Sequence, residues 1–122
     1  MPDRQRTLLA LRRRDRADAI ERLNRLLDKY DDVSDTINLL SREAKASESA
    51  LERARPQGRT IGFALLCDFN HRQQLQKKLT MLQSDLKKSE EKLATLGKAI
   101  AEAKTAVAKT QRALEAIDHI RE

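Results

Sequence analysis

The sequence predicts an all-α protein in which two long helices form an antiparallel coiled-coil hairpin. Two stripes of apolar residues, each with a repeat of about 3.5 residues, predict the helices, because such a stripe is the contact seam of a coiled coil. A short segment with proline and glycine, at about 56–62, separates the stripes, and these helix breakers allow the chain to reverse direction. Aromatic residues make up 2% of the chain and charged residues 36%, a composition typical of long, solvent-exposed helices.

The more regular stripe predicts the second helix, which we expect at about 63–121. Eleven of its thirteen positions are apolar. No proline interrupts the stripe, and Gly97 lies outside it. The stripe consists of Leu75, Leu79, Leu82, Leu86, Ser89, Leu93, Leu96, Ile100, Ala103, Val107, Thr110, Leu114 and Ile117.

The first helix is expected at about 3–55. Asp3 is a candidate N-cap, because its carboxylate can accept hydrogen bonds from the free backbone N–H groups of the first turn. Nine of the ten positions in its stripe are apolar or aromatic. The stripe consists of Leu23, Leu26, Tyr30, Val33, Ile37, Leu40, Ala44, Ser47, Leu51 and Ala54. We therefore expect residues 1–122 to form a single hairpin domain.

The similar lengths of the two arms predict how the helices are aligned. A turn centred on 59–60 brings every stripe position of one arm opposite a stripe position of the other. It also places the small Ser89 opposite the bulky Tyr30, which close packing favours. Two other registers, displaced by one heptad in either direction, also align the stripes but centre the turn on Pro56 or Phe63.

Towards the turn, the expected register makes the seam more polar. It places Ser47 beside Arg72 and Leu51 beside Asp68. We therefore expect the helices to pack less tightly there than in the middle of the hairpin.

The end that carries both termini is expected to be slim, basic and weakly packed. Arg12 and Arg16 occupy stripe positions and face Ala103 and Val107 in an alanine-rich part of the second helix. The arginine stems can cover this thin seam while their charged heads stay in water. The first sixteen residues carry six arginines and two aspartates, so this end is strongly basic.

No residue pattern in the sequence indicates catalysis, a metal site or a cofactor site. Cys67 is the single cysteine, which excludes an intramolecular disulfide and a cysteine-rich zinc site. His71 and His119 belong to different parts of the hairpin and share no metal-ligand spacing. We therefore expect a protein that is not an enzyme and has no cofactor.

The chain is expected to be cytoplasmic and not inserted in a membrane. Residues 1–16 lack an apolar run followed by a small-residue cleavage site, so they do not resemble a signal peptide. The longest apolar run, 61–67, is too short to cross a bilayer. The lone cysteine fits a reducing compartment.

Three interpretations remain for the four arginines within residues 12–16. They can bind an acidic protein partner, form a solvated helix face, or serve as the basic region of a DNA-binding zipper. Against the zipper, leucines interrupt residues 8–11 and the asparagine that contacts bases in such helices is missing. A fork on DNA also needs a parallel dimer, whereas the register favours a hairpin. We expect no specific binding to nucleic acid.

Residues 61–69 form an apolar segment next to the turn and contain both phenylalanines, Phe63 and Phe69. The segment is apolar on more than one face. Two interpretations remain: its side chains cover the tip of the hairpin themselves, or they dock on another protein.

Residues 8–17, Leu-Leu-Ala-Leu-Arg-Arg-Arg-Asp-Arg-Ala, are followed by a seam through Leu23, Leu26 and Leu27. This opening resembles the start of the FliJ/YscO family, small basic coiled-coil proteins of flagellar and injectisome type III secretion. Length, charge, scarcity of aromatic residues and two equal arms are similar over nearly the whole chain.

The resemblance implies a non-enzymatic stalk or adaptor, cytoplasmic and peripheral to a membrane-embedded secretion apparatus. The end with the termini would enter the pore of a hexameric export ATPase, much as the gamma subunit does in rotary ATPases. The chain would also contact the cytoplasmic domain of the export gate and secretion chaperones.

The resemblance also assigns candidate contact residues. Those expected to contact the ATPase are Leu8, Leu11, Arg12, Arg13, Arg14 and Arg16. Those expected to contact the gate or a chaperone are Leu27, Tyr30, Phe63 and Phe69. The first two of this second set fit the Leu-x-x-Tyr spacing that family members carry at a gate contact. Two alternatives from other classes remain: the DNA-binding zipper, and a generic structural coiled coil in which two hairpins pack into a bundle.

Overall fold

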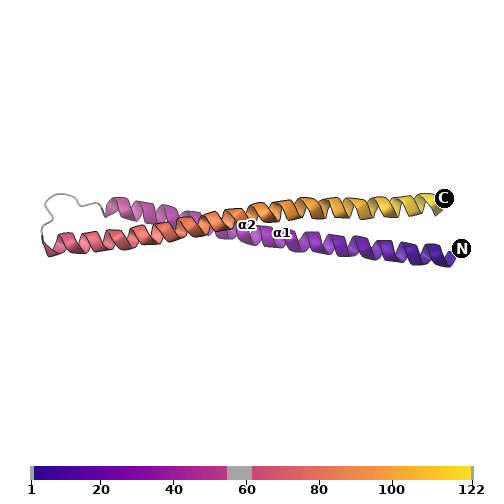
Figure 1. Cartoon of the computed structure of the whole chain (residues 1–122), viewed down its shortest axis with the longest axis horizontal. Coiled ribbons are helices and arrows are strands. Elements are labelled where there is room, and N and C mark those ends of the chain that lie inside the picture. Colours follow the sequence, from indigo (N-terminus) through magenta and orange to yellow (C-terminus); the bar gives the residue numbers. More distant parts are fainter. Residues whose placement is uncertain (1, 55–61, 122) are drawn as a thin grey trace. The chain divides into compact units, whose positions relative to one another are not determined.

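The computed structural model describes residues 2–54 and 62–121, except for the side chains of residues 2, 63–65, 120 and 121. Two helices account for nearly all of this part of the chain: α1, Pro2–Arg53, and α2, Phe63–Arg121 (Figure 1). The described residues contain no strand, so the predicted all-α hairpin of two helices is confirmed. The predicted turn at about 56–62 lies almost entirely outside the described residues.

The ends of the helices differ slightly from the prediction. Helix α1 begins at Pro2, which suits a first helical position because its fixed φ and missing N–H cost nothing there. Asp3 therefore lies inside the first turn and is not the N-cap, although its charge still favours the N-terminal end of the helix dipole. At the start of α2, Gly62 has a φ of 76°, a conformation that glycine adopts readily, and its carbonyl accepts a hydrogen bond from Leu66 N at 3.2 Å.

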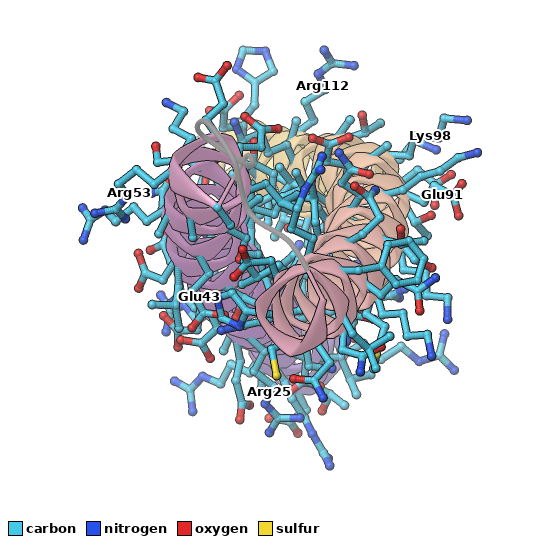
Figure 2. The ribbon with its side chains drawn as sticks, turned by 90° about the vertical axis from the view of Figure 1, so that its left-hand side faces the viewer. Arg25, Glu43, Arg53, Glu91, Lys98 and Arg112 are labelled. Atoms are coloured by element: carbon cyan, nitrogen blue, oxygen red, sulfur yellow. The ribbon has the colours of Figure 1, made fainter. Side chains whose placement is uncertain are left out.

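The predicted stripes are confirmed as the contact seam. All thirteen stripe positions of α2, all nine of α1 and Ala54 just beyond α1 are buried or half-buried. The charged side chains point outward, as Figure 2 shows for Arg53, Lys98 and Arg112. Among the described residues, none of the large side chains is completely buried, because each helix has only one neighbour to cover it.

Two compact units divide the chain. The first consists of Met1–Asp32 and Leu93–Glu122, and the second of Val33–Lys92. The first unit carries both termini, which lie at the same end of the helix pair (Figure 1). Because α1 and α2 each run through both units, each unit contains a segment of both helices.

The core of the first unit includes a cluster of Leu9, Leu114 and Ile117, each 8% exposed. This cluster was not predicted, although residues 10–18 of α1, between Leu9 and the stripe, are all exposed as a thin seam would have them. Arg12 and Arg16 are exposed, whereas Leu9 is buried on the seam one to two turns earlier. A buried leucine near the N-terminus stabilises the pair where the arginines alone would leave it open.

The core of the second unit is a cluster of Ala44, Leu79 and Leu82, with Leu40 and Leu51 packed against it. Ser47 is also buried, with 5% of its surface exposed. Small side chains on α1 thus lie near large side chains on α2, which lets the two backbones approach closely.

These clusters show that the expected register is wrong by roughly one heptad. A turn centred on 59–60 would place Leu9 opposite Thr110, but Leu9 packs with Leu114 and Ile117. Each such pair lies further along α2 than expected, which matches the alternative register centred on Phe63. The apolar pattern alone does not distinguish registers that differ by a whole repeat. Contacts near the ends of the helices, such as those of Leu9, distinguish them.

The same displacement corrects the predicted neighbours near the turn. Leu51 was expected beside Asp68, but it packs against the cluster that includes Leu79. Arg72, expected beside Ser47, instead lines a hollow with Leu51. In the observed register Leu51 has apolar neighbours, whereas in the expected register it would lie beside a carboxylate. Burial of a carboxylate costs free energy, which favours the observed register.

The expected pairing of Ser89 with Tyr30 is also replaced. Ser89 lines a shallow hollow within the second unit together with Thr36 and Leu40. Tyr30 belongs to the first unit and is half-buried on the seam of α1.

Within the described residues, neither helix has a stretch that is long and apolar enough to cross a membrane.

Candidate partner-binding surface at the terminal end

The first turns of α1 present two exposed leucines beside the buried one. Leu8 is 43% exposed and Leu11 is 51% exposed, whereas Leu9 is 8% exposed. Successive residues of a helix are rotated by about 100°, so a single leucine faces α2 and its neighbours face solvent. Leu8 and Leu11 are three residues apart and lie on the same side of α1, where they form an apolar strip.

This strip borders a shallow hollow on one face of α1. Asp3, Arg4, Thr7, Leu8 and Leu11 line the hollow, and their spacing places all of them within two and a half turns. The hydroxyl Oγ1 of Thr7 donates a hydrogen bond to the carbonyl of Asp3 at 2.8 Å. This bond satisfies the Thr7 hydroxyl within the helix, so the hollow offers mainly apolar contact.

The four arginines after the strip are all exposed. Arg13 and Arg16 follow Leu9 by four and seven residues and emerge along the edges of the seam, whereas Arg14 emerges on the far side of α1. Arg12 forms an ion pair with Asp15, with 3.6 Å between Nη1 and Oδ2. Both side chains are about half exposed, so the pair contributes little to stability and leaves Arg12 available.

The segment of α2 near Leu114 carries both basic and acidic side chains, including Arg112 and Glu115. Gln111 donates a hydrogen bond from Nε2 to Oε1 of Glu115 at 3.3 Å, while its own Oε1 is buried without a hydrogen-bond partner. Arg112 points away from the helix pair (Figure 2). Positive charge at this end is densest on α1, where residues 12–16 hold four arginines.

All six residues predicted to contact an ATPase are thus exposed on one short segment of α1. They form the candidate partner-binding surface, which we define as Leu8, Leu11, Arg12, Arg13, Arg14 and Arg16. Within this segment, Leu9 packs against Leu114 and Ile117 of α2. An apolar strip surrounded by guanidinium groups can bind a protein surface that combines apolar and acidic side chains.

The residues of the second predicted set are divided between the two units. Leu27 is 37% exposed and Tyr30 is half-buried, and both lie on α1 in the first unit. Phe69 lies in the second unit and is 55% exposed. The side chain of Phe63 is not among those that the structure describes. Of residues 61–69, the structure describes the side chains of 66–69 only, so whether this segment covers the tip itself or docks on another protein stays a prediction.

Phe69 also belongs to a hollow that the sequence analysis did not predict. It lines a shallow hollow with Leu51, Arg72, Gln73 and Gln76. Nε of Arg72 is buried and has no hydrogen-bond partner. The signal available in the sequence was the spacing of Leu66 and Phe69, which places two exposed apolar side chains on one side of α2.

The described residues contain no group of three His, Cys, Asp or Glu side chains placed to hold a metal ion. The single cysteine, Cys67, is exposed. Ion pairs lie on the exposed outer faces of the helices, as the pair between Arg25 and Glu21 on α1 does.

Comparison of the chain with models of protein families, with curated proteins and with solved structures finds no match. The fold class is therefore established by the helices themselves, and the function has to be argued from the surface.

Proposed function

We propose that this protein is a non-enzymatic stalk or adaptor of a type III secretion apparatus. Its terminal end inserts into the pore of the hexameric export ATPase, and the remainder links the ATPase to the cytoplasmic domain of the export gate and to secretion chaperones. The protein acts in the cytoplasm, peripheral to the membrane-embedded apparatus. The resemblance of residues 8–17 to the FliJ/YscO family motivates the proposal.

The observation that carries the proposal is the exposure of the candidate partner-binding surface on the paired helices. Leu8 and Leu11 are 43% and 51% exposed although Leu9, beside them, is buried against α2. Two exposed leucines side by side form an apolar strip that a partner can cover, and arginine is one of the residues enriched among those that dominate binding energy at interfaces.

The slim cross-section of the first unit suits a narrow pore. Two paired helices measure about 20 Å across, since each helix with its side chains is about 10–12 Å wide. The buried Ala103, 5% exposed, belongs to the seam of this segment, where a small side chain lets the helices approach closely. Arginines that point to several sides of α1 can meet acidic side chains on successive subunits of a ring.

The test is charge reversal of Arg12, Arg13, Arg14 and Arg16 to Glu. We expect helix content and melting temperature to change little, because all four side chains are exposed. Each exposed charge contact is worth roughly 0.2–1 kcal/mol, so only their combined reversal should weaken binding to the ATPase hexamer and lower its stimulated turnover.

A matched control reverses four exposed lysines on α2 in the second unit. These are Lys77, Lys78, Lys87 and Lys88. The control makes the same change in net charge and should leave ATPase stimulation intact. Loss of stimulation in the control together with its retention in the arginine variant would refute the assignment of the terminal end to the ATPase.

A further inference from the structure

A second heptad stripe runs along α2 within the second unit, beside the seam. Its positions alternate in steps of three and four residues, and all of their side chains are exposed. Gln76, Thr80 and Gln83 each follow a seam residue by one position, which is a rotation of about 100° around the helix. The stripe therefore faces away from the seam. We call it the lateral stripe, and it consists of Leu66, Phe69, Gln73, Gln76, Thr80 and Gln83.

The lateral stripe carries no charged residue, although charged residues make up 36% of the chain. Leu66 and Phe69 are large apolar side chains that are 54% and 55% exposed. The hydroxyl of Thr80 donates a hydrogen bond to the carbonyl of Gln76 at 2.9 Å, so the helix already satisfies this donor. Depletion of charge distinguishes the core of an interface from the rest of a surface, and burial of uncharged groups costs less free energy than burial of charges.

The lateral stripe borders a hollow that both helices form. Phe69, Gln73 and Gln76 line it together with Arg72 and with Leu51 of α1. The hollow measures about 240 Å³, whereas small-molecule sites measure roughly 300–1,000 Å³. It is therefore better suited to a side chain of a larger partner. Heptad spacing beside a hollow is the arrangement that receives the side chains of another helix, as in a coiled coil.

The charges that border the lateral stripe are positive. Arg72 precedes Gln73 by one residue and Lys77 follows Gln76 by one residue. Nε of Arg72 is buried and has no hydrogen-bond partner, so Asp68, one turn earlier, does not accept a hydrogen bond from it. Asp68 is the single acidic residue within 66–83. Arginine has a flexible stem and binds carboxylates through two parallel hydrogen bonds, so a carboxylate brought by a partner can pair with Arg72.

We propose that the lateral stripe docks an amphipathic helix of another protein, one whose apolar seam is flanked by Glu or Asp. A second copy of this chain fits less well, because it brings the same two basic borders. Residues 55–61 of this chain also fit less well, because they contain two arginines and no acidic residue. The site goes beyond the proposed stalk function: it lies in the second unit, outside the candidate partner-binding surface, and does not depend on the assignment to secretion.

A pair of labelled peptides added to the full chain tests the proposal. Each peptide has about three heptads with Leu at positions a and d, and the two differ in carrying either Glu or Lys at positions e and g. Fluorescence anisotropy measures binding. We expect the Glu peptide to bind at least about ten times more tightly than the Lys peptide, because the borders of the lateral stripe are basic. Equal binding of the two peptides would overturn the proposal.

A first pair of variants tests the apolar part of the lateral stripe. Leu66→Gln combined with Phe69→Gln should weaken binding of the Glu peptide at least about ten-fold. The matched control is Leu39→Gln combined with Met81→Gln, which alters two exposed apolar residues of the same unit outside the stripe, and it should leave binding unchanged. All four side chains are exposed, so the melting temperature should change little in both variants. An equal effect of the two variants on peptide binding would contradict docking on the lateral stripe.

A second pair of variants tests the basic borders. Arg72→Gln combined with Lys77→Gln should weaken binding of the Glu peptide and reduce its dependence on salt. Lys78→Gln combined with Lys92→Gln makes the same change in net charge at exposed positions away from the stripe and should alter neither property. Equal effects would reduce the attraction to net charge and refute the site. Self-association of the chain that Leu66→Gln with Phe69→Gln abolishes would assign the lateral stripe to a second copy and overturn the proposal as well.

Discussion

Neighbouring leucines near the N-terminus have different roles because of where each one points. Leu9 is buried against α2, whereas Leu8 and Leu11 are exposed on another side of α1. Burying a leucine side chain stabilises by roughly 1.5–3 kcal/mol, so only Leu9 contributes strongly to holding the helices together. The exposed leucines contribute little to folding and are available to a partner.

Leu9→Ala is therefore expected to reduce the free energy of unfolding by about 2–4 kcal/mol, since it removes a buried side chain and leaves a gap. Leu11→Ala should change it by less than about 0.5 kcal/mol, because the site is exposed and has no buried contacts to lose. Urea denaturation followed by far-UV circular dichroism measures both. Similar losses at the two positions would contradict the assignment of Leu9 as the core residue.

At the scale of the helix, position on the seam decides the importance of a residue more than its type. Leu82 is 8% exposed and Met81, its neighbour in the chain, is 67% exposed. One lies on the stripe of α2 and the other beside it. Their contrast shows that the period of about 3.5 residues governs burial along the helix.

Leu82→Ala is expected to lower the free energy of unfolding by about 2–4 kcal/mol, less if relaxation of the narrow seam fills the gap. Met81→Ala should be close to neutral or slightly stabilising, because alanine has the higher helix propensity. Thermal and chemical denaturation of both variants provide the test. A loss at Met81 as large as that at Leu82 would indicate that a second face of α2 is covered.

The sequence predicts helices and seam well and predicts the register poorly, for one physical reason. Leu79 and Leu82 are recognisable as seam residues from their spacing, because spacing along one helix is local information. Pairing between helices depends on which repeat meets which, and the repeats of this chain resemble one another. The contacts of Leu9 distinguish the registers, but Leu9 lay outside the recognised stripe because arginines separate it from Leu23.

The candidate sites, too, were predictable from the sequence only in part. Arg12 and Arg16 were identifiable from charge density, and the structure shows both as exposed. The hollow beside Phe69 was missed because it needs Leu51 from the other helix, and that contact depends on the register.

At the scale of the whole molecule, covered seams predict a monomer. Every stripe position on both helices is already buried or half-buried within the chain. A bundle of two hairpins needs a second continuous apolar face on each, but the exposed Leu27, Leu39 and Met81 do not recur with the heptad. Analytical ultracentrifugation should give a mass near 13.9 kDa at micromolar concentration. A stable dimer there would favour the generic bundle.

The net charge of the molecule also predicts how it meets nucleic acid. The charge of +6 arises from 25 basic and 19 acidic residues, so most positive charges lie among negative ones. Leu9 packs against Leu114 and Ile117 of its own chain, so in this state it is not free for the seam of a parallel dimer on DNA. Phosphate contacts release counterions, which makes binding that depends on charge fall steeply with salt.

We therefore expect weak binding to duplex DNA at low salt, with little dependence on sequence, that disappears near physiological ionic strength of about 0.15 M. Fluorescence anisotropy with two unrelated labelled duplexes, titrated across a series of salt concentrations, measures both properties. The variant in which Arg12, Arg13, Arg14 and Arg16 are reversed to Glu should lose even the weak binding, because it removes the densest positive cluster. Nanomolar binding at physiological salt that distinguishes the two duplexes would instead assign this cluster to the DNA-binding zipper, and the arginines would then contact bases and phosphates in place of an ATPase ring.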